Sequence, residues 1–147
     1  MALKDVIAAT SSGAPHGAPA LINLAGIRVL LVDDDDAQLE IVSTLLEHAK
    51  AEVVTATSAE HALRELARQA PDVIVSDISM PDCDGYHFLR RVRARAAQAG
   101  GTTPAIALTA KTATVDHSRA LLAGYQVHLA KPVRVIELLV AIRKLVD

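Results

Sequence analysis

The chain has 147 residues, of which 51% are hydrophobic and 22% charged, a composition typical of one folded domain rather than of a disordered chain. The formal net charge of −2 argues against direct nucleic-acid binding, and a single cysteine, Cys83, excludes an intrachain disulfide and a multi-cysteine zinc site. Because no apolar run reaches the length of a membrane span and no secretory signal is visible, we expect a cytoplasmic protein without membrane insertion.

Residues 1–26 differ in composition from the rest of the chain. Residues 10–20 read TSSGAPHGAPA, which is rich in the small residues and prolines that are typical of linkers. We therefore expect residues 1–26 to form a flexible tail or linker and residues 27–147 to form the folded domain.

From residue 27 onward, short apolar runs alternate with stretches of helical spacing. The runs are 27–32 (IRVLLV), 52–56 (EVVTA), 72–76 (DVIVS), 104–109 (PAIALT) and 127–130 (VHLA). The stretches that follow them place apolar residues on one helical face: Leu39, Val42, Leu46 and Ala49; Ala59, Ala62, Leu63 and Leu66; Leu89, Val92 and Ala96; Val115, Leu121 and Leu122; Val135, Leu138, Leu139 and Ile142. Continuous apolar strands are covered on both faces, so the pattern predicts an α/β fold with a five-stranded, doubly wound parallel sheet.

Local signals mark the ends of several predicted helices. Ser58 is the expected N-cap of the second helix, and Asp35 and Asp36 are expected to cap the first. Gly100 and Gly124 stand where helices are expected to end.

Four arginines make the third predicted helix basic: Arg90, Arg91, Arg93 and Arg95. We interpret them as a solvated face, with a docking surface as the alternative.

Acidic residues follow two of the predicted strands. Asp33 and Asp34 come directly after the first strand, and Asp77 ends the third. In an open parallel sheet, ligands bind outside the carboxyl ends of the strands, so these carboxylates converge if the two strands are neighbours. Converging carboxylates repel one another, and Mg²⁺, which prefers oxygen ligands, is the natural compensating ion. A solvated turn is the alternative interpretation of the aspartate run.

Two further polar residues lie at the same predicted edge. Thr109 ends the fourth strand, and Lys131 follows the fifth. A hydroxyl and an ammonium group beside a metal-binding acidic cluster suit a phosphoryl group, because the cation and the lysine neutralise its oxygens while the hydroxyl donates a hydrogen bond. A carboxylate in such a site can act as the nucleophile that accepts the phosphoryl group.

Residues 27–147 resemble the receiver domain of bacterial two-component response regulators, of the chemotaxis-Y-like kind. The resemblance rests on VDDD (32–35), SDISMPDCDGY (76–86), ALTA (107–110) and AKP (130–132), in matching order and spacing. It implies a flavodoxin-like receiver fold with strand order 2-1-3-4-5. That order would place the first strand beside the third, as the acidic cluster requires.

The resemblance also implies roles for the residues of this edge. Asp77 corresponds to the phosphoacceptor and Lys131 to the lysine that pairs with the phosphoryl group. Asp33, Asp34, Asp77 and the backbone carbonyl of Ser79 correspond to the Mg²⁺ ligands. Thr109 corresponds to the switch hydroxyl, Gly85 to the glycine of the loop after the phosphoacceptor, and Lys131-Pro132 to a cis peptide bond.

Three positions depart from the commonest family pattern. His128 occupies the position of the switch aromatic residue, and Lys50 occupies a turn position that often holds glycine. Lys111 lies two residues beyond Thr109, where lysine is unusual. By resemblance, Ser79 and Lys111 flank the path of the hydrolytic water and so are expected to tune the lifetime of the phosphoryl group.

The function implied is a receiver that accepts a phosphoryl group from a histidine kinase or a histidine phosphotransfer protein and then changes its protein-binding surface. Such a domain would catalyse only its own phosphorylation and dephosphorylation. A stand-alone receiver and a receiver from a hybrid histidine kinase both fit the sequence. Two other functions remain open, a Mg²⁺-dependent phosphohydrolase that forms an aspartyl phosphate and a pseudo-receiver that binds partners without phosphorylation.

Overall fold

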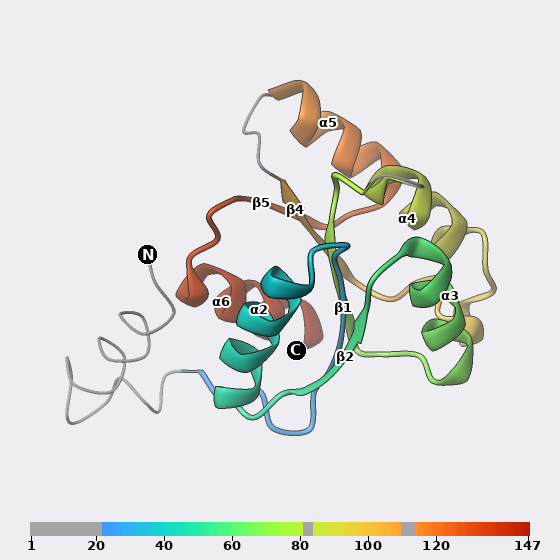
Figure 1. Cartoon of the computed structure of the whole chain (residues 1–147). Helices are drawn as coiled ribbons and strands as arrows, with labels where there is room; N and C mark the ends of the chain where they lie inside the picture. The colour runs from blue at the N-terminus through green and yellow to red at the C-terminus, as the bar shows by residue number, and fades with distance from the viewer. Residues whose placement is uncertain (1–21, 81–83, 110–113) are drawn as a thin grey trace, which may run out of the picture.

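Five short strands alternate with helices along the chain, and each predicted strand agrees with the observed one to within one residue at either end. The computed structural model describes residues 22–80, 84–109 and 114–147, and within the last range it describes side chains from Ser118 onward. The elements are, in chain order, β1 (Arg28–Val32), α2 (Asp36–His48), β2 (Glu52–Ala56), α3 (Ala59–Arg68), β3 (Val73–Asp77), α4 (Gly85–Arg93), the 3₁₀ turn η2 (Ala97–Ala99), β4 (Ala105–Thr109), α5 (Thr114–Ala123), β5 (Val127–Ala130) and α6 (Val135–Val146) (Figure 1).

The strands form one parallel sheet in the order β2-β1-β3-β4-β5, which confirms the predicted fold class and strand order. The central strands β3 and β4 are buried along their whole length. Burial on both faces explains why these strands read as continuous apolar runs rather than as an alternation. Because β1 lies beside β3, the residues that follow the carboxyl ends of these two strands become neighbours.

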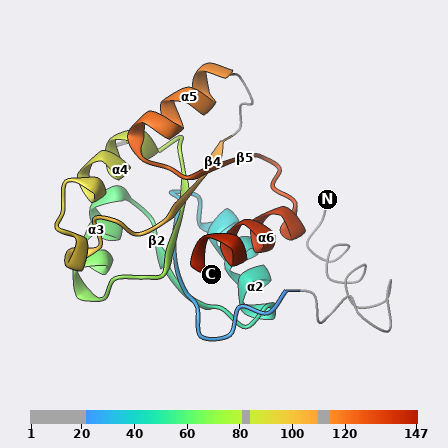
Figure 2. The same cartoon turned by 180° about the vertical axis from the view of Figure 1, so that it is seen from behind.

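Helices cover both faces of the sheet, as Figures 1 and 2 show from opposite sides. Helices α2 and α6 pack on one face, and α3, α4 and α5 pack on the other. Successive side chains of β3 lie on alternate faces of the sheet. Ile74 belongs to the buried cluster under α3 and α4, whereas Val75 belongs to the cluster under α2 and α6. Within the described residues, no helix has both the length and the apolar character that crossing a membrane would require.

The predicted N-caps Asp35 and Ser58 are confirmed, whereas Gly100 ends the turn η2 and not α4, whose C-cap is Ala94. The Asp35 carboxylate accepts hydrogen bonds from the backbone N–H groups of Ala37 (2.9 Å) and Gln38 (3.3 Å), and Asp36 lies in the first turn of α2. The Ser58 hydroxyl oxygen accepts from the backbone N–H of His61 at 3.1 Å. These side chains satisfy N–H groups that have no partner within the helix.

The segment after α4 differs from the prediction. Ala96, the last member of the predicted apolar stripe, lies beyond the helix, which ends at Arg93. Arg93 also does not belong to a solvated face, because its guanidinium group donates to the carbonyl oxygens of Gly101 (3.0 Å), Thr103 (2.6 Å) and Gly124 (2.8 Å). One half-buried side chain therefore ties α4 to the connections before β4 and before β5.

The packed structure begins before the predicted boundary at residue 27. Leu24 is fully buried in the cluster beneath α2 and α6, and its backbone N–H donates to the Ala49 carbonyl oxygen at 2.7 Å. A guanidinium N–H of Arg143 on α6 donates to the Asn23 carbonyl oxygen at 3.1 Å. Residues 22–26 thus pack with the domain, because Leu24 fills core space that composition alone does not reveal. Residues 1–21 lie outside the described part of the chain.

Lys50, in the turn between α2 and β2, adopts a left-handed backbone conformation with φ of 77°. A side chain at such a φ crowds the backbone, whereas glycine adopts it readily. We expect Lys50→Gly to raise the free energy of unfolding by about 1 kcal/mol, measured by urea denaturation. Lys50→Ala, which shortens the side chain but keeps Cβ, is the matched control and should give no comparable gain. An equal gain in both variants would show that the lysine side chain, rather than the backbone, causes the strain.

Candidate phosphoryl-transfer and metal site

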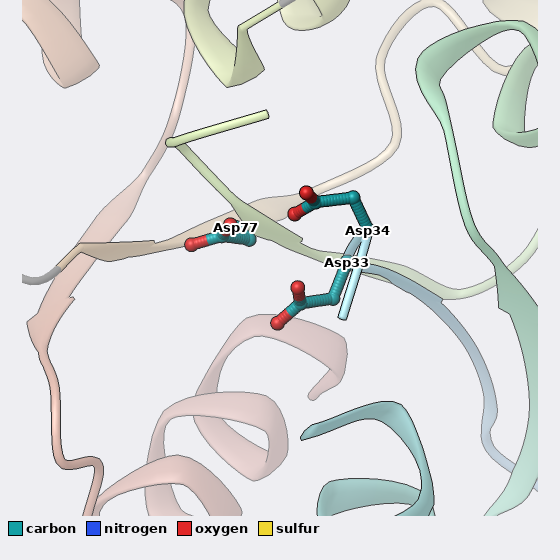
Figure 3. Close-up of side chains that lie close together, drawn as sticks. All are labelled: Asp33, Asp34 and Asp77. Carbon is teal, nitrogen blue, oxygen red and sulfur yellow. The ribbon is translucent and has the colours of Figure 1, made fainter. Parts of the chain in front are cut away.

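Three aspartates lie together at the carboxyl edge of the sheet. Val32 on β1 pairs with Ser76 on β3, so the next residues of the two strands, Asp33 and Asp77, lie side by side. One carboxylate oxygen from each of Asp33, Asp34 and Asp77 lies within 4.8 Å of the others. Figure 3 shows the three side chains turned toward the same space. The structure therefore brings together the carboxylates that the sequence places at this edge.

Asp33 is held in place by the backbone around it and is 5% exposed. Its N–H donates to the Ala56 carbonyl oxygen at 3.1 Å, and its carboxylate accepts from the Asp35 N–H at 2.9 Å. Burial raises the pKa of Asp33 and the charge of Asp77 raises it further, which together outweigh the lowering by the Asp35 N–H and by Lys131. The ionised carboxylate is therefore poorly compensated, and an additional cation would stabilise it.

Lys131 supplies a positive charge to this cluster. Its Nζ atom lies 2.9 Å from Asp77 Oδ1 and 3.5 Å from Asp33 Oδ2. Burial lowers the pKa of Lys131, but the hydrogen bond and charge of Asp77, together with those of Asp33, outweigh burial, so the net shift is upward. The bond between Lys131 and Pro132 is cis, as the resemblance implies.

Thr109 lies on β4, the strand next to β3, and His128 lies on β5, beyond β4. Thr109 is the last residue of β4 and is 4% exposed, and its carbonyl oxygen accepts from the Lys131 backbone N–H at 2.6 Å. On β4, the neighbour of Asp77 is Leu108, so Thr109 lies one residue beyond it at the same edge. His128 is half-buried on β5, opposite Ala107.

Other residues of the predicted site contribute differently. Ser79 is exposed in the connection that follows Asp77. Asp35 caps α2, and neither it nor Asp36 belongs to the cluster of three carboxylates. Lys111 and Cys83 lie outside the described residues, so the proposed effect of Lys111 on phosphoryl lifetime stays a prediction.

Two features of the site were not predicted. A groove of about 540 Å³ lies beside Asp33 and Lys131, between α2 and the segment that leads into α6, and Ile41 and Val133 belong to its largely apolar lining. Tyr125, just before β5, donates a hydrogen bond to the Gly85 carbonyl oxygen at the start of α4. Both depend on contacts between segments distant in sequence, and the exposed Ile41 on α2 is the one local signal that could have indicated the groove.

The donor set fits a small, hard cation. Asp33, Asp34 and Asp77 all offer carboxylate oxygens, the ligand type that Mg²⁺ prefers, and the pKa of Asp33 is raised first by its burial and then by the charge of Asp77. The three carboxylates could therefore hold such an ion. Lys131 already provides a positive charge to one oxygen of Asp77, Oδ1, in the absence of the ion.

Comparisons with known proteins agree with this geometry. Residues 29–143 match the family model of the response regulator receiver domain. An uncharacterized 14.6 kDa protein of Leptolyngbya boryana is 40% identical over 116 residues, which are 79% of this chain and 87% of that protein. The transcriptional regulatory protein TrcR of Mycobacterium tuberculosis is 36% identical over 119 residues, which span 81% of this chain but 45% of TrcR.

Among solved structures, the receiver domain of a sensor histidine kinase from Pseudomonas aeruginosa has a TM-score of 0.75 and 32% sequence identity. The alignment covers 83% of this chain and 98% of that one. That structure holds a magnesium ion coordinated in its active site cleft.

Proposed function

This chain belongs to the response regulator receiver domain family of two-component signalling, and from that membership we propose that it accepts a phosphoryl group from a phosphohistidine onto Asp77. The observation that carries the proposal is the 2.9 Å contact between Lys131 Nζ and Asp77 Oδ1 within the cluster of three aspartates. This contact joins a nucleophile, a fixed positive charge and oxygen ligands for a cation in one site.

In the proposed step, an ionised carboxylate oxygen of Asp77 attacks the phosphorus atom of the donor. The phosphorus–nitrogen bond to the donor imidazole breaks, and the nitrogen leaves with the bonding electron pair. The products are an aspartyl phosphate on this chain and an unmodified histidine on the donor. Lys131 contacts the Asp77 carboxylate before the transfer and pairs with the phosphoryl oxygens after it.

We propose that Asp33, Asp34, Asp77 and the backbone carbonyl of Ser79 hold Mg²⁺. When bound, this ion supplies neutralisation of the negative charge on the phosphoryl oxygens. The aspartates would hold the ion at the edge of the sheet, beside the Asp77 carboxylate that receives the phosphoryl group.

The proposed response to phosphorylation starts at Thr109. An aspartyl phosphate carries roughly 1.5 to 2 negative charges in place of the single charge of the carboxylate, and the Thr109 hydroxyl can donate a hydrogen bond to one of the new oxygens. His128 on the adjacent strand would then follow Thr109, and the surface formed by α5, β5 and α6 would change its affinity for a downstream protein. Two leucines on that surface, Leu121 and Leu122, are 49% and 85% exposed.

A histidine kinase or a histidine phosphotransfer protein is the proposed donor. The groove beside Asp33 and Lys131 supports this proposal, because it gives a protein partner apolar surface next to the reacting carboxylate. Ile41, 38% exposed on α2, extends that apolar surface outward.

Incubation with phosphoramidate and Mg²⁺, followed by intact-mass spectrometry, tests the proposed function. A receiver should gain one phosphoryl adduct per chain. Continued release of inorganic phosphate over many turnovers, without an accumulating adduct, would instead identify a phosphohydrolase. Absence of both adduct and phosphate release would identify a pseudo-receiver.

The metal proposal predicts a stabilisation that depends on Asp34. Since Mg²⁺ binds the folded site and not the unfolded chain, a concentration ten times its Kd should raise the free energy of unfolding by about 1.4 kcal/mol. Asp34→Ala should abolish this gain in a thermal-unfolding experiment. Asp36→Ala, which removes a carboxylate outside the cluster, should keep it. If Asp34→Ala responds to Mg²⁺ as the unmodified protein does, the metal binds elsewhere.

A further inference from the structure

A buried tyrosine connects the end of α5 to the centre of the sheet. Tyr125 is 2% exposed, and its backbone N–H donates to the Ala120 carbonyl oxygen at 3.0 Å, so its main chain is fixed to the last turn of α5. It shares a buried cluster with Ala105 and Ala107 of β4. From its place just before β5, its hydroxyl reaches the start of α4.

The hydroxyl of Tyr125 meets two residues that flank the phosphoacceptor. It donates a hydrogen bond of 2.7 Å to the carbonyl oxygen of Gly85, the first residue of α4. The side chain of Ser76, the residue before Asp77, also lies beside the phenol. Burial raises the pKa of Tyr125 far above its ordinary value, so the phenol stays neutral and keeps its proton for the bond to Gly85.

Both partners of the phenol contact the backbone of Asp77 directly. The Ser76 hydroxyl donates to the Asp77 carbonyl oxygen at 3.0 Å. A Cβ atom on Gly85 would lie 2.6 Å from that same oxygen, so only glycine allows α4 to begin so close to β3. The Gly85 N–H further donates to the Ile78 carbonyl oxygen at 2.8 Å. The Tyr125 hydroxyl is therefore connected to the backbone of Asp77 through one intervening residue, either Gly85 or Ser76.

We propose that Tyr125 is a positioning residue for phosphoryl transfer, which holds the Asp77 backbone in the orientation that its carboxylate needs for attack. This inference rests on the proposed function of Asp77 as phosphoacceptor. Attack on phosphorus requires an aligned oxygen, and small displacements of a nucleophile slow such reactions strongly. Tyr125 does not touch the phosphoryl group, so its effect acts through Gly85 and Ser76.

The test is Tyr125→Phe, which removes one oxygen atom and keeps the buried ring. Labelling of the full chain by phosphoramidate in saturating Mg²⁺ is followed by intact mass over a range of donor concentrations. We expect the maximum rate to fall about three- to tenfold while the half-saturating donor concentration stays unchanged, because Tyr125 orients the nucleophile and does not bind the donor. Val92→Ala, which removes apolar volume from the same buried cluster, controls for a general loss of stability.

Four outcomes would overturn the inference: an unchanged maximum rate, a change confined to the half-saturating concentration, an equal slowing in Val92→Ala, or full additivity with Ser76→Ala. Because the phenol and Ser76 both act on the backbone of Asp77, the double variant should be little slower than the slower single variant. If Tyr125→Phe does not fold, Ser76→Ala alone is the test variant, and its maximum labelling rate should fall by the same factor. Failure of the unmodified protein to label would refute the proposed function instead.

Discussion

Asp77→Asn should abolish phosphoryl acceptance and leave the fold intact. The amide has nearly the shape of the carboxylate but is not a nucleophile, so no acyl phosphate can form at this position. Asp77 is 4% exposed at the end of β3, where an isosteric replacement disturbs packing least. Intact-mass spectra after treatment with phosphoramidate and Mg²⁺ should show a full adduct on the unmodified protein and none on the variant.

Asp36→Asn provides the matched control for this prediction. It makes the same chemical change on an exposed aspartate of α2 that lies outside the carboxylate cluster. We expect this variant to be labelled at the rate of the unmodified protein. A full adduct on Asp77→Asn would show that another residue accepts the phosphoryl group.

Lys131→Met should have the second largest effect, a fall of about 100-fold in the labelling rate at saturating Mg²⁺. The lysine lies 2.9 Å from Asp77 Oδ1, where it can neutralise charge that develops on the phosphoryl oxygens. Methionine keeps most of the length and apolar surface of the side chain but not its charge. Lys131→Arg keeps the positive charge in a group of different shape, so its labelling rate should lie between those of the unmodified protein and Lys131→Met. Equal labelling rates for Lys131→Met and the unmodified protein would show that Lys131 has no role in the reaction.

The same substitution should also change stability in a way that depends on pH. The pKa of Lys131 is raised in the folded protein, so deprotonation of Lys131 itself removes its contribution only above its ordinary value of 10.5. Without Mg²⁺, Lys131→Met should therefore lose about 2 kcal/mol at about pH 8 in urea denaturation. The loss should shrink at about pH 4, because Asp33, whose pKa is raised, then protonates and needs no counter-charge.

The backbone of the site could be predicted from sequence because it depends on local patterns. Apolar runs fixed the strands, and the position of Asp77 at the end of β3 followed from where its run stops. The resemblance added the strand order that brings β1 beside β3, and the observed sheet confirms that order. Parallel register then places Asp33 beside Asp77 without any further information.

Contacts between distant side chains could not be predicted in this way. Tyr125 and Gly85 are 40 residues apart, and no periodicity indicates that a buried phenol will reach this carbonyl group. Leu24 was assigned to a linker because residues 10–20 have linker composition, although Leu24 is buried in the core and Ile22 packs against the same cluster. Arg93 was assigned to solvent because a charged residue on a basic helix usually is solvated.

The two connections that Arg93 and its neighbour Arg91 make differ in their sensitivity to ionic strength. Arg91 joins α4 to α3 through an ion pair with Glu60, in which both side chains are largely in contact with water. Mobile ions screen such a pair. Arg93 instead joins α4 to the turn after α5 through backbone carbonyl oxygens, which carry no net charge to be screened. Rising salt should therefore loosen the contact of α4 with α3 while α4 stays attached to α5, so the two neighbours of one helix respond differently to the same solvent.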